Sequence, residues 1–128
     1  MCVLLVEDEP LILECMAETF SEAGYEVATA VDGASAIALI EGSEFVLSAL
    51  VTDYHLPGGF DGPEVIARMR RRYPVVPIVI ATARRELLTI EWQRKHQAEV
   101  LRKPYSMATL LAMFQRLSPL TPIKRAAV

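Results

Sequence analysis

The apolar residues of this sequence gather in five short runs, which alternate with segments where apolar positions recur every three or four residues. Short apolar runs rich in branched side chains predict strands, and they cover residues 2–6, 26–30, 49–53, 75–81 and 99–102. The spacing of three or four residues predicts helices, which cover residues 10–24, 32–42, 61–72, 86–97 and 106–117. The pattern therefore predicts strands and helices in strict alternation.

This alternation determines the predicted fold class. Strand–helix–strand units place successive strands parallel, joined by right-handed crossovers, with helices on both faces of the sheet. We expect a doubly wound α/β sandwich, (βα)5, whose five-stranded parallel sheet has the flavodoxin-like order 2-1-3-4-5. We expect residues 1–118 to form this one domain and residues 119–128 to form a flexible C-terminal tail.

Residues that favour helix ends support most of these boundaries. Asp32 and Ser106 are candidate N-caps, and residues 61–64 have the sequence of a capping box. The segment 86–97 has the weakest support, because its apolar residues do not fall on one stripe. We expect its helix to be short, mobile or part of an interface.

Charge and composition exclude several classes of protein. The 128 residues carry a net charge of -3 at pH 7, which gives no electrostatic attraction for nucleic acid. No apolar run reaches the roughly 18 residues that a membrane span requires, and the first residues lack the basic start of a signal peptide. The two cysteines, Cys2 and Cys15, are not spaced as a metal-binding pair, and they predict reduced thiols in a cytoplasmic protein.

Polar side chains stand at the carboxyl ends of four predicted strands. Glu7 and Asp8 follow the first strand, Asp53 ends the third, Thr82 follows the fourth and Lys103 follows the fifth. In the predicted order these ends are neighbours along one edge of the sheet. Three carboxylates brought together repel unless a cation lies among them, and oxygen ligands favour a hard ion such as Mg²⁺. A hydroxyl and an ammonium beside Asp53 suit a phosphoryl group, so we expect a site for both.

With these residues, the sequence resembles a known family, the receiver domains of two-component response regulators. The resemblance covers about residues 2 to 118. It is carried by Glu7-Asp8, residues 52–58, Asp61-Gly62, Thr82-Ala83 and residues 103–105. Each segment alone has low specificity, whereas their order and intervals together are highly specific.

The resemblance implies that Asp53 becomes a 4-aspartylphosphate. Its carboxylate would take a phosphoryl group from the phosphohistidine of a sensor histidine kinase or a histidine phosphotransfer protein. Lys103 would pair with the phosphoryl oxygens, and Thr82 would donate its hydroxyl to one of them and shift toward it. The Lys103–Pro104 bond is expected to be cis in this family. Such a protein is a signalling domain that catalyses only its own phosphotransfer and dephosphorylation.

The resemblance also implies the ligands of Mg²⁺. Asp8 and Asp53 would bind the ion directly, and the main-chain carbonyl of His55 would supply a further oxygen. Glu7 is one methylene longer than the aspartate often found at this position, so it would act through a water molecule. We expect the side chain of His55 to face solvent, where it and Arg84 would tune the access of water to the acyl phosphate.

Two positions depart from the family pattern. The family usually has an aromatic residue three positions before the lysine, where this sequence has Val100. The usual joint movement of the threonine and that ring is therefore in question. Gly59 is an apparent extra residue in the loop after Asp53. We expect it to reshape the surface that faces a partner.

Two other functions stay open at the level of the sequence. One is a phosphorylation-independent interaction scaffold, which the substitution at Val100 keeps open. The other is an aspartyl-phosphate hydrolase of the haloacid-dehalogenase type. Those enzymes typically carry a second aspartate two residues after the nucleophile, where this sequence has His55.

The sequence also bears on partners. The residues after Leu117 are too few for an output domain, so we expect a stand-alone receiver whose output is a binding event or a further phosphotransfer, or else a fragment of a longer protein. The resemblance points to the fourth helix, fifth strand and fifth helix as the place of a homodimer. We expect neither nucleic acid nor a membrane as a direct partner.

Overall fold

The sheet has the predicted topology. The computed structural model describes residues 1–118, and the predicted tail at 119–128 lies outside the described residues. Five parallel strands form one sheet in the order β2-β1-β3-β4-β5, which confirms the predicted fold class. The strands are β1 Cys2–Val6, β2 Glu26–Ala30, β3 Leu47–Asp53, β4 Ile78–Thr82 and β5 Glu99–Arg102.

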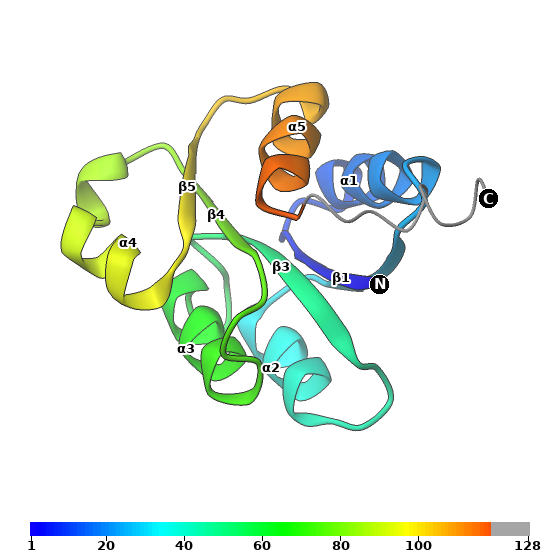
Figure 1. The fold of residues 1–128 in the computed structure, drawn as a ribbon, viewed down its shortest axis with the longest axis horizontal. Helices are drawn as coiled ribbons and strands as arrows, with labels where there is room; N and C mark the ends of the chain where they lie inside the picture. The colour runs from blue at the N-terminus through cyan, green and yellow to red at the C-terminus, as the bar shows by residue number, and fades with distance from the viewer. Residues whose placement is uncertain (119–128) are drawn as a thin grey trace.

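Helices cover both faces of this sheet. They are α1 Pro10–Glu22, α2 Gly33–Glu41, α3 Gly62–Arg72, α4 Ile90–His96 and α5 Met107–Leu117, with a 3₁₀ turn, η1, at Arg85–Leu87. In Figure 1, α1 and α5 lie side by side on one face, whereas α2 and α3 lie on the other and α4 stands near β5. Within residues 1–118, no helix has the length and apolar character needed to cross a bilayer.

The central strands are buried on both faces, as their continuous apolar runs predict. Leu4 and Leu50, at the middle of β1 and β3, have no exposed surface. On the face covered by α1 and α5, the rings of Phe20, Tyr25 and Phe114 pack together with centres 5.1 to 5.9 Å apart. Tilted and edge-on packing of this kind stabilises aromatic clusters. The core therefore holds the sheet rigidly beneath the strand ends.

The predicted helix caps are present. Asp32, Ser106 and Asp61 each accept a hydrogen bond from the main-chain N–H three residues ahead, at 2.7, 3.0 and 3.1 Å. Glu64 completes the capping box by accepting from the N–H of Asp61. These contacts supply partners for helix N–H groups that have none within the helix, which is why the three helices begin at these residues.

The fourth strand and the fourth helix begin later than predicted. β4 starts at Ile78 instead of residue 75, because Pro77 has no N–H to offer a neighbouring strand, and Val75 is 85% exposed. The helix expected from residue 86 is replaced at its start by η1. Thr89 then caps α4 by accepting from the N–H of Trp92.

A side chain from α3 holds the carboxyl end of α4. None of the seven residues of α4 is fully buried, so packing anchors it weakly. Arg70 donates hydrogen bonds to the carbonyl oxygens of His96, Gln97 and Val76, at 2.6, 2.7 and 2.7 Å. Burial lowers the pKa of the Arg70 guanidinium. Its charged hydrogen bonds to His96 and Gln97 satisfy carbonyls that the end of the helix leaves without partners.

Candidate functional site

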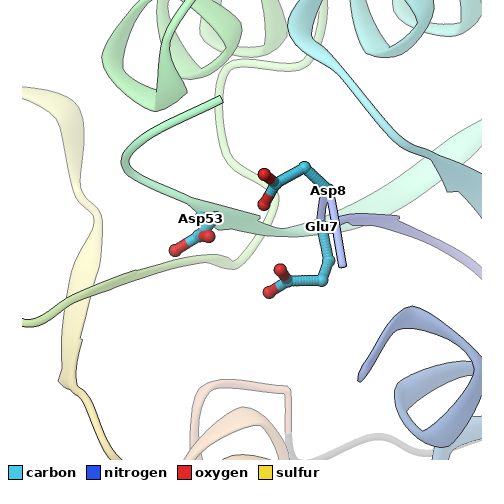
Figure 2. Close-up of side chains that lie close together, drawn as sticks. All are labelled: Glu7, Asp8 and Asp53. Carbon is cyan, nitrogen blue, oxygen red and sulfur yellow. The ribbon is translucent and has the colours of Figure 1, made fainter. Parts of the chain in front are cut away.

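The strand ends bring the acidic residues of the predicted site together. Glu7 and Asp8 follow β1 and Asp53 ends β3, and these two strands are neighbours in the sheet. Figure 2 shows the three side chains reaching into one space above the strand ends. One carboxylate oxygen from each residue lies within 4.8 Å of the others. We refer to these three residues as the acidic cluster.

Two members of the acidic cluster are buried. Glu7 is 3% exposed and Asp53 is 6% exposed, whereas Asp8 faces solvent. Burial is the main cause that raises the pKa of Asp53, and the negative charge of Asp8 raises it further. Burial likewise raises the pKa of Glu7. Since all three donors are oxygens and their charges repel, the cluster fits a hard divalent cation.

Lys103, the residue that follows β5, reaches the acidic cluster. Its Nζ lies 2.7 Å from Oδ1 of Asp53, and this ion pair opposes the rise in the pKa of Asp53. The main-chain N–H of Lys103 donates to the carbonyl of Thr82 at 2.9 Å, which ties the start of this loop to β4. The Lys103–Pro104 peptide bond is cis, as the resemblance implied. The structure thus brings an ammonium directly to the central carboxylate.

Thr82 ends β4 in a buried position. Asp53 is paired with Ala81 in the β3–β4 register, so Thr82 stands one residue beyond the partner of Asp53. Its side chain is 1% exposed, and its hydroxyl oxygen accepts a hydrogen bond from the N–H of Arg84 at 3.0 Å. The hydroxyl is therefore linked to the main chain of the segment that leads into η1.

The loop after Asp53 depends on glycine. Gly58 and the extra Gly59 have φ angles of 85° and 96°, which lie in the region that favours glycine. The side chain of His55 is exposed, with its ring centre 4.8 Å from that of Tyr54. The predicted metal ligand of His55 is its main-chain carbonyl, and that role stays a prediction.

An apolar pocket of about 440 Å³ adjoins the site. It is lined by Glu7, Ile12, Ala83, Lys103, Pro104, Tyr105 and Met107. Burial, together with the negative charges of Glu7 and Asp53, raises the pKa of Tyr105 to about 12. Tyr105 therefore holds its phenolic proton more tightly than an ordinary tyrosine does.

Thr52 was not among the predicted site residues, although it contacts the central residue. The Thr52 hydroxyl donates to the main-chain carbonyl oxygen of Asp53 at 2.9 Å. The signal available in the sequence was a single hydroxyl residue between the apolar run 49–51 and the aspartate. A threonine also suits a strand for its shape alone, so this signal was not specific.

The sequence matches the family model of the response regulator receiver domain over residues 3–115. The transcriptional regulatory protein TcrA of Mycobacterium tuberculosis is 36% identical over 124 residues, which are 96% of this chain and 48% of that protein. The response regulator protein FleR of Pseudomonas aeruginosa is 33% identical over 115 residues, which are 89% of this chain and 24% of that protein. The chain thus spans about half the length of these curated relatives, or less.

Solved structures agree with the family model. The chemotaxis response regulator CheY4 of Vibrio cholerae is 31% identical, with a TM-score of 0.76 over 91% of this chain and 97% of that chain. A response regulator receiver protein from Sinorhizobium medicae is 26% identical, with a TM-score of 0.77 over 91% of this chain and 93% of that chain. The strand order and the acidic cluster fit these likenesses. The chain belongs to the response regulator receiver domain family.

Proposed function

We propose that Asp53 accepts a phosphoryl group from a phosphohistidine, with Mg²⁺ held beside it by the acidic cluster. As a receiver domain, the chain is a phosphorylatable component of two-component signalling, and the family implies a histidine kinase as partner in general. The choice of Asp53 rests mainly on one observation, its 2.7 Å contact with Lys103 inside the acidic cluster. We propose that the donor is a sensor histidine kinase or a histidine phosphotransfer protein.

Phosphoryl transfer needs little covalent chemistry from the protein, which mainly positions the reacting groups and stabilises their charge. A carboxylate oxygen of Asp53 bonds to phosphorus in line, while the phosphorus–nitrogen bond of the phosphohistidine breaks. The released imidazole nitrogen takes up a proton from solvent. Lys103, already beside Oδ1, would stay close to the phosphoryl oxygens and offset their charge.

The metal would be held by oxygen donors of this chain. Asp8 and Asp53 would be direct ligands, the main-chain carbonyl of His55 a further ligand, and Glu7 a partner through water. Receiver domains bind Mg²⁺ at an acidic pocket, and the acidic cluster here has the matching donors. When bound, the ion would neutralise charge on the phosphoryl oxygens during transfer.

Thr82 would bind the phosphoryl group after transfer. Its buried hydroxyl stands at the end of β4, next to the pairing partner of Asp53. We propose that it donates to a phosphoryl oxygen and shifts toward it. The slow hydrolysis of the acyl phosphate would then be catalysed by this domain itself.

Intact-mass measurement after incubation with Mg²⁺ and acetyl phosphate tests the proposal. The wild-type chain is expected to gain the mass of one phosphoryl group, and the gain should require Mg²⁺. The Asp53→Ala variant should gain none. Asp32→Asn is a suitable control, because asparagine also caps a helix and should preserve α2.

The same assay separates the other two functions. A wild-type chain that stays unmodified while Mg²⁺ is bound would contradict the proposal and favour a phosphorylation-independent scaffold, for which Val100 is the supporting observation. Continuous release of phosphate from simple phosphomonoesters would instead indicate a hydrolase.

We also propose a homodimer through α4, β5 and α5. β5 is an edge strand of the sheet, and Ile90 at the start of α4 is 57% exposed, so this face offers unpaired surface. Sedimentation at several concentrations, with and without acetyl phosphate, tests this state. A monomer under all conditions would contradict it. A cytoplasmic location is part of the proposal and is supported by the free thiols of Cys2 and Cys15.

A further inference from the structure

Thr52 contacts the phosphoacceptor through the main chain. It precedes Asp53 on β3, and it is 1% exposed. Its Oγ1 donates to the main-chain carbonyl oxygen of Asp53 at 2.9 Å. This hydrogen bond is buried, so the competition from water that weakens such bonds at a surface is absent.

The carbonyl of Asp53 lies just beyond the end of the pairing between β1 and β3. The last pair in the β1–β3 register is Val6 with Thr52, so Asp53 stands one residue beyond it. A buried carbonyl without a partner costs free energy. The Thr52 hydroxyl supplies a donor at this point, where the pairing of the two strands has ended.

The other side of the same backbone segment is fixed by two further contacts. The N–H of Tyr54 donates to the carbonyl of Ala81 in β4 at 2.9 Å, and the N–H of Gly62 donates to the carbonyl of Tyr54 at 2.7 Å. A Cβ at Gly62 would collide with the carbonyl oxygen of Asp53 and would lie 2.9 Å from Cα of Tyr54. The Asp53–Tyr54 peptide unit is thus held by Thr52 and from β4, and the next peptide unit is held from α3.

We propose that Thr52 is a positioning residue for the metal and phosphoryl site. Its hydroxyl fixes the peptide unit that joins Asp53 to Tyr54. That unit sets the direction of the Asp53 carboxylate and the path of the chain to the carbonyl of His55. Both groups are ligands in the function proposed above, on which this inference rests. Loss of the hydroxyl would remove one of the contacts that hold this peptide unit and would weaken the simultaneous hold of both ligands on one ion.

The variants Thr52→Val and Thr52→Ser test the role of the hydroxyl. Valine keeps the shape of threonine and removes the donor, whereas serine keeps the donor and removes a methyl group. Thr29→Val on β2, at an exposed position, is the matched control. The first measurement is the Mg²⁺ affinity of the unphosphorylated chain by calorimetry. The second is the Mg²⁺ concentration that gives half-maximal labelling by acetyl phosphate.

We expect Thr52→Val to weaken Mg²⁺ binding about three- to tenfold, the size that follows from losing one hydrogen bond. The Mg²⁺ concentration for half-maximal labelling should rise in parallel, and labelling at saturating Mg²⁺ should approach that of the wild type. Thr52→Ser and Thr29→Val should bind Mg²⁺ within about twofold of the wild type, because the hydroxyl that donates to Asp53 is kept in both.

Other outcomes would overturn the inference. Unchanged Mg²⁺ affinity in Thr52→Val would show that the hydroxyl does not position the ligands. An equal loss in Thr52→Ser would assign the effect to packing of the methyl group. If Thr52→Val does not fold, Thr52→Cys takes its place, since its thiol is a weaker donor of similar size. A wild-type chain that binds no Mg²⁺ would remove the proposed function and this inference together, whereas a failure confined to the variants would leave the proposed function intact.

Discussion

At Asp53, burial and an ion pair act on the same carboxylate in opposite directions. Burial is the largest single cause acting on the pKa of Asp53 and raises it, Lys103 lowers it through its hydrogen bond and its charge, and the net shift is upward. Glu7 is buried as well, and its pKa is also raised. The metal-free site therefore holds negative charge at a cost to folding, which is a common property of sites built to bind a cation.

The raised pKa of Glu7 predicts how stability depends on pH. The folded state holds the proton of Glu7 more tightly than the unfolded state, so folding takes up protons in this range. The contribution of Glu7 to stability is full below its ordinary pKa of 4.5 and is lost as the pH rises through the higher folded value. In metal-free buffer, Glu7→Gln should therefore be more stable than the wild type at neutral pH.

Urea unfolding with a chelator present checks this prediction. Glutamine can still accept the hydrogen bond that Glu7 takes from the N–H of Glu9 at 3.1 Å. The gain should shrink as the pH approaches 4.5. Glu9→Gln, at an exposed neighbouring position, is the control. A Glu7→Gln variant that is less stable than the wild type at neutral pH would contradict the argument.

The exposed residues beside the site predict the lifetime of the acyl phosphate. His55 and Arg84 are exposed, and the side chain of Arg84 is drawn toward Glu86 by an ion pair of 3.2 Å. Arg84→Ala removes a long side chain near the strand end. It keeps the main-chain N–H that donates a hydrogen bond to the Thr82 hydroxyl. We expect faster loss of the phosphoryl group in Arg84→Ala and an altered rate in His55→Asn. Decay rates equal to that of the wild type, followed by mass, would refute this.

Among the elements, α4 depends most on a single contact from elsewhere. Its seven residues include none that is fully buried, and Arg70 of α3 binds the carbonyls of His96 and Gln97 at its end. Arg70→Met should therefore loosen α4 while the rest of the sheet stays folded. A charged hydrogen bond contributes about 1.5–3 kcal/mol, so amide protection near the end of α4 should fall by about tenfold or more.

Hydrogen exchange followed by mass spectrometry measures this effect. Arg71→Met is the matched control, because Arg71 is the next residue along α3 and its side chain is exposed. The control should leave the exchange of residues 89–98 unchanged. Equal protection of α4 in the wild type and Arg70→Met would show that its packing alone suffices.

The elements also differ in how well local sequence predicts them. The starts of α2, α3 and α5 follow from Asp32, Asp61 and Ser106, because a cap acts on its own first turn. The predicted start of α4 was wrong by four residues, because η1 precedes Thr89, the residue that caps the helix. The contacts of Arg70 with α4 join residues that are separated by 26 and 27 positions in the sequence. Local periodicity contains no information about such contacts.

For the molecule as a whole, the parallel topology does most to assemble the site. Residues from 7 to 103 meet because the carboxyl ends of parallel strands share one edge. The meeting of the three carboxylates and of Lys103 with Asp53 was therefore predictable from strand order. The contact of Thr52 with Asp53 was not predictable in this way. Which donor reaches the Asp53 carbonyl depends on the backbone geometry at the end of the strand.

Binding of a cation to the folded chain should stabilise it as a unit. A ligand that binds only the folded state adds about 2.7 kcal/mol at a free concentration one hundred times its Kd. We expect Mg²⁺ to raise the unfolding temperature with its concentration. Asp8→Asn should reduce this rise, and Asp32→Asn should not. Thermal scans of the three chains with Mg²⁺ or a chelator decide the matter, and an equal rise in Asp8→Asn would exclude Asp8 as a ligand.

The contact between Thr82 and Arg84 has a consequence for how the chain relays a signal. A threonine hydroxyl donates one hydrogen bond and can accept another at the same time, so Thr82 can hold the amide of Arg84 while it binds a phosphoryl oxygen. Movement of the hydroxyl toward Asp53 would then pull the polypeptide ahead of η1 in the same direction. A relay of this kind passes through the backbone, and it would work whichever side chain occupies position 100.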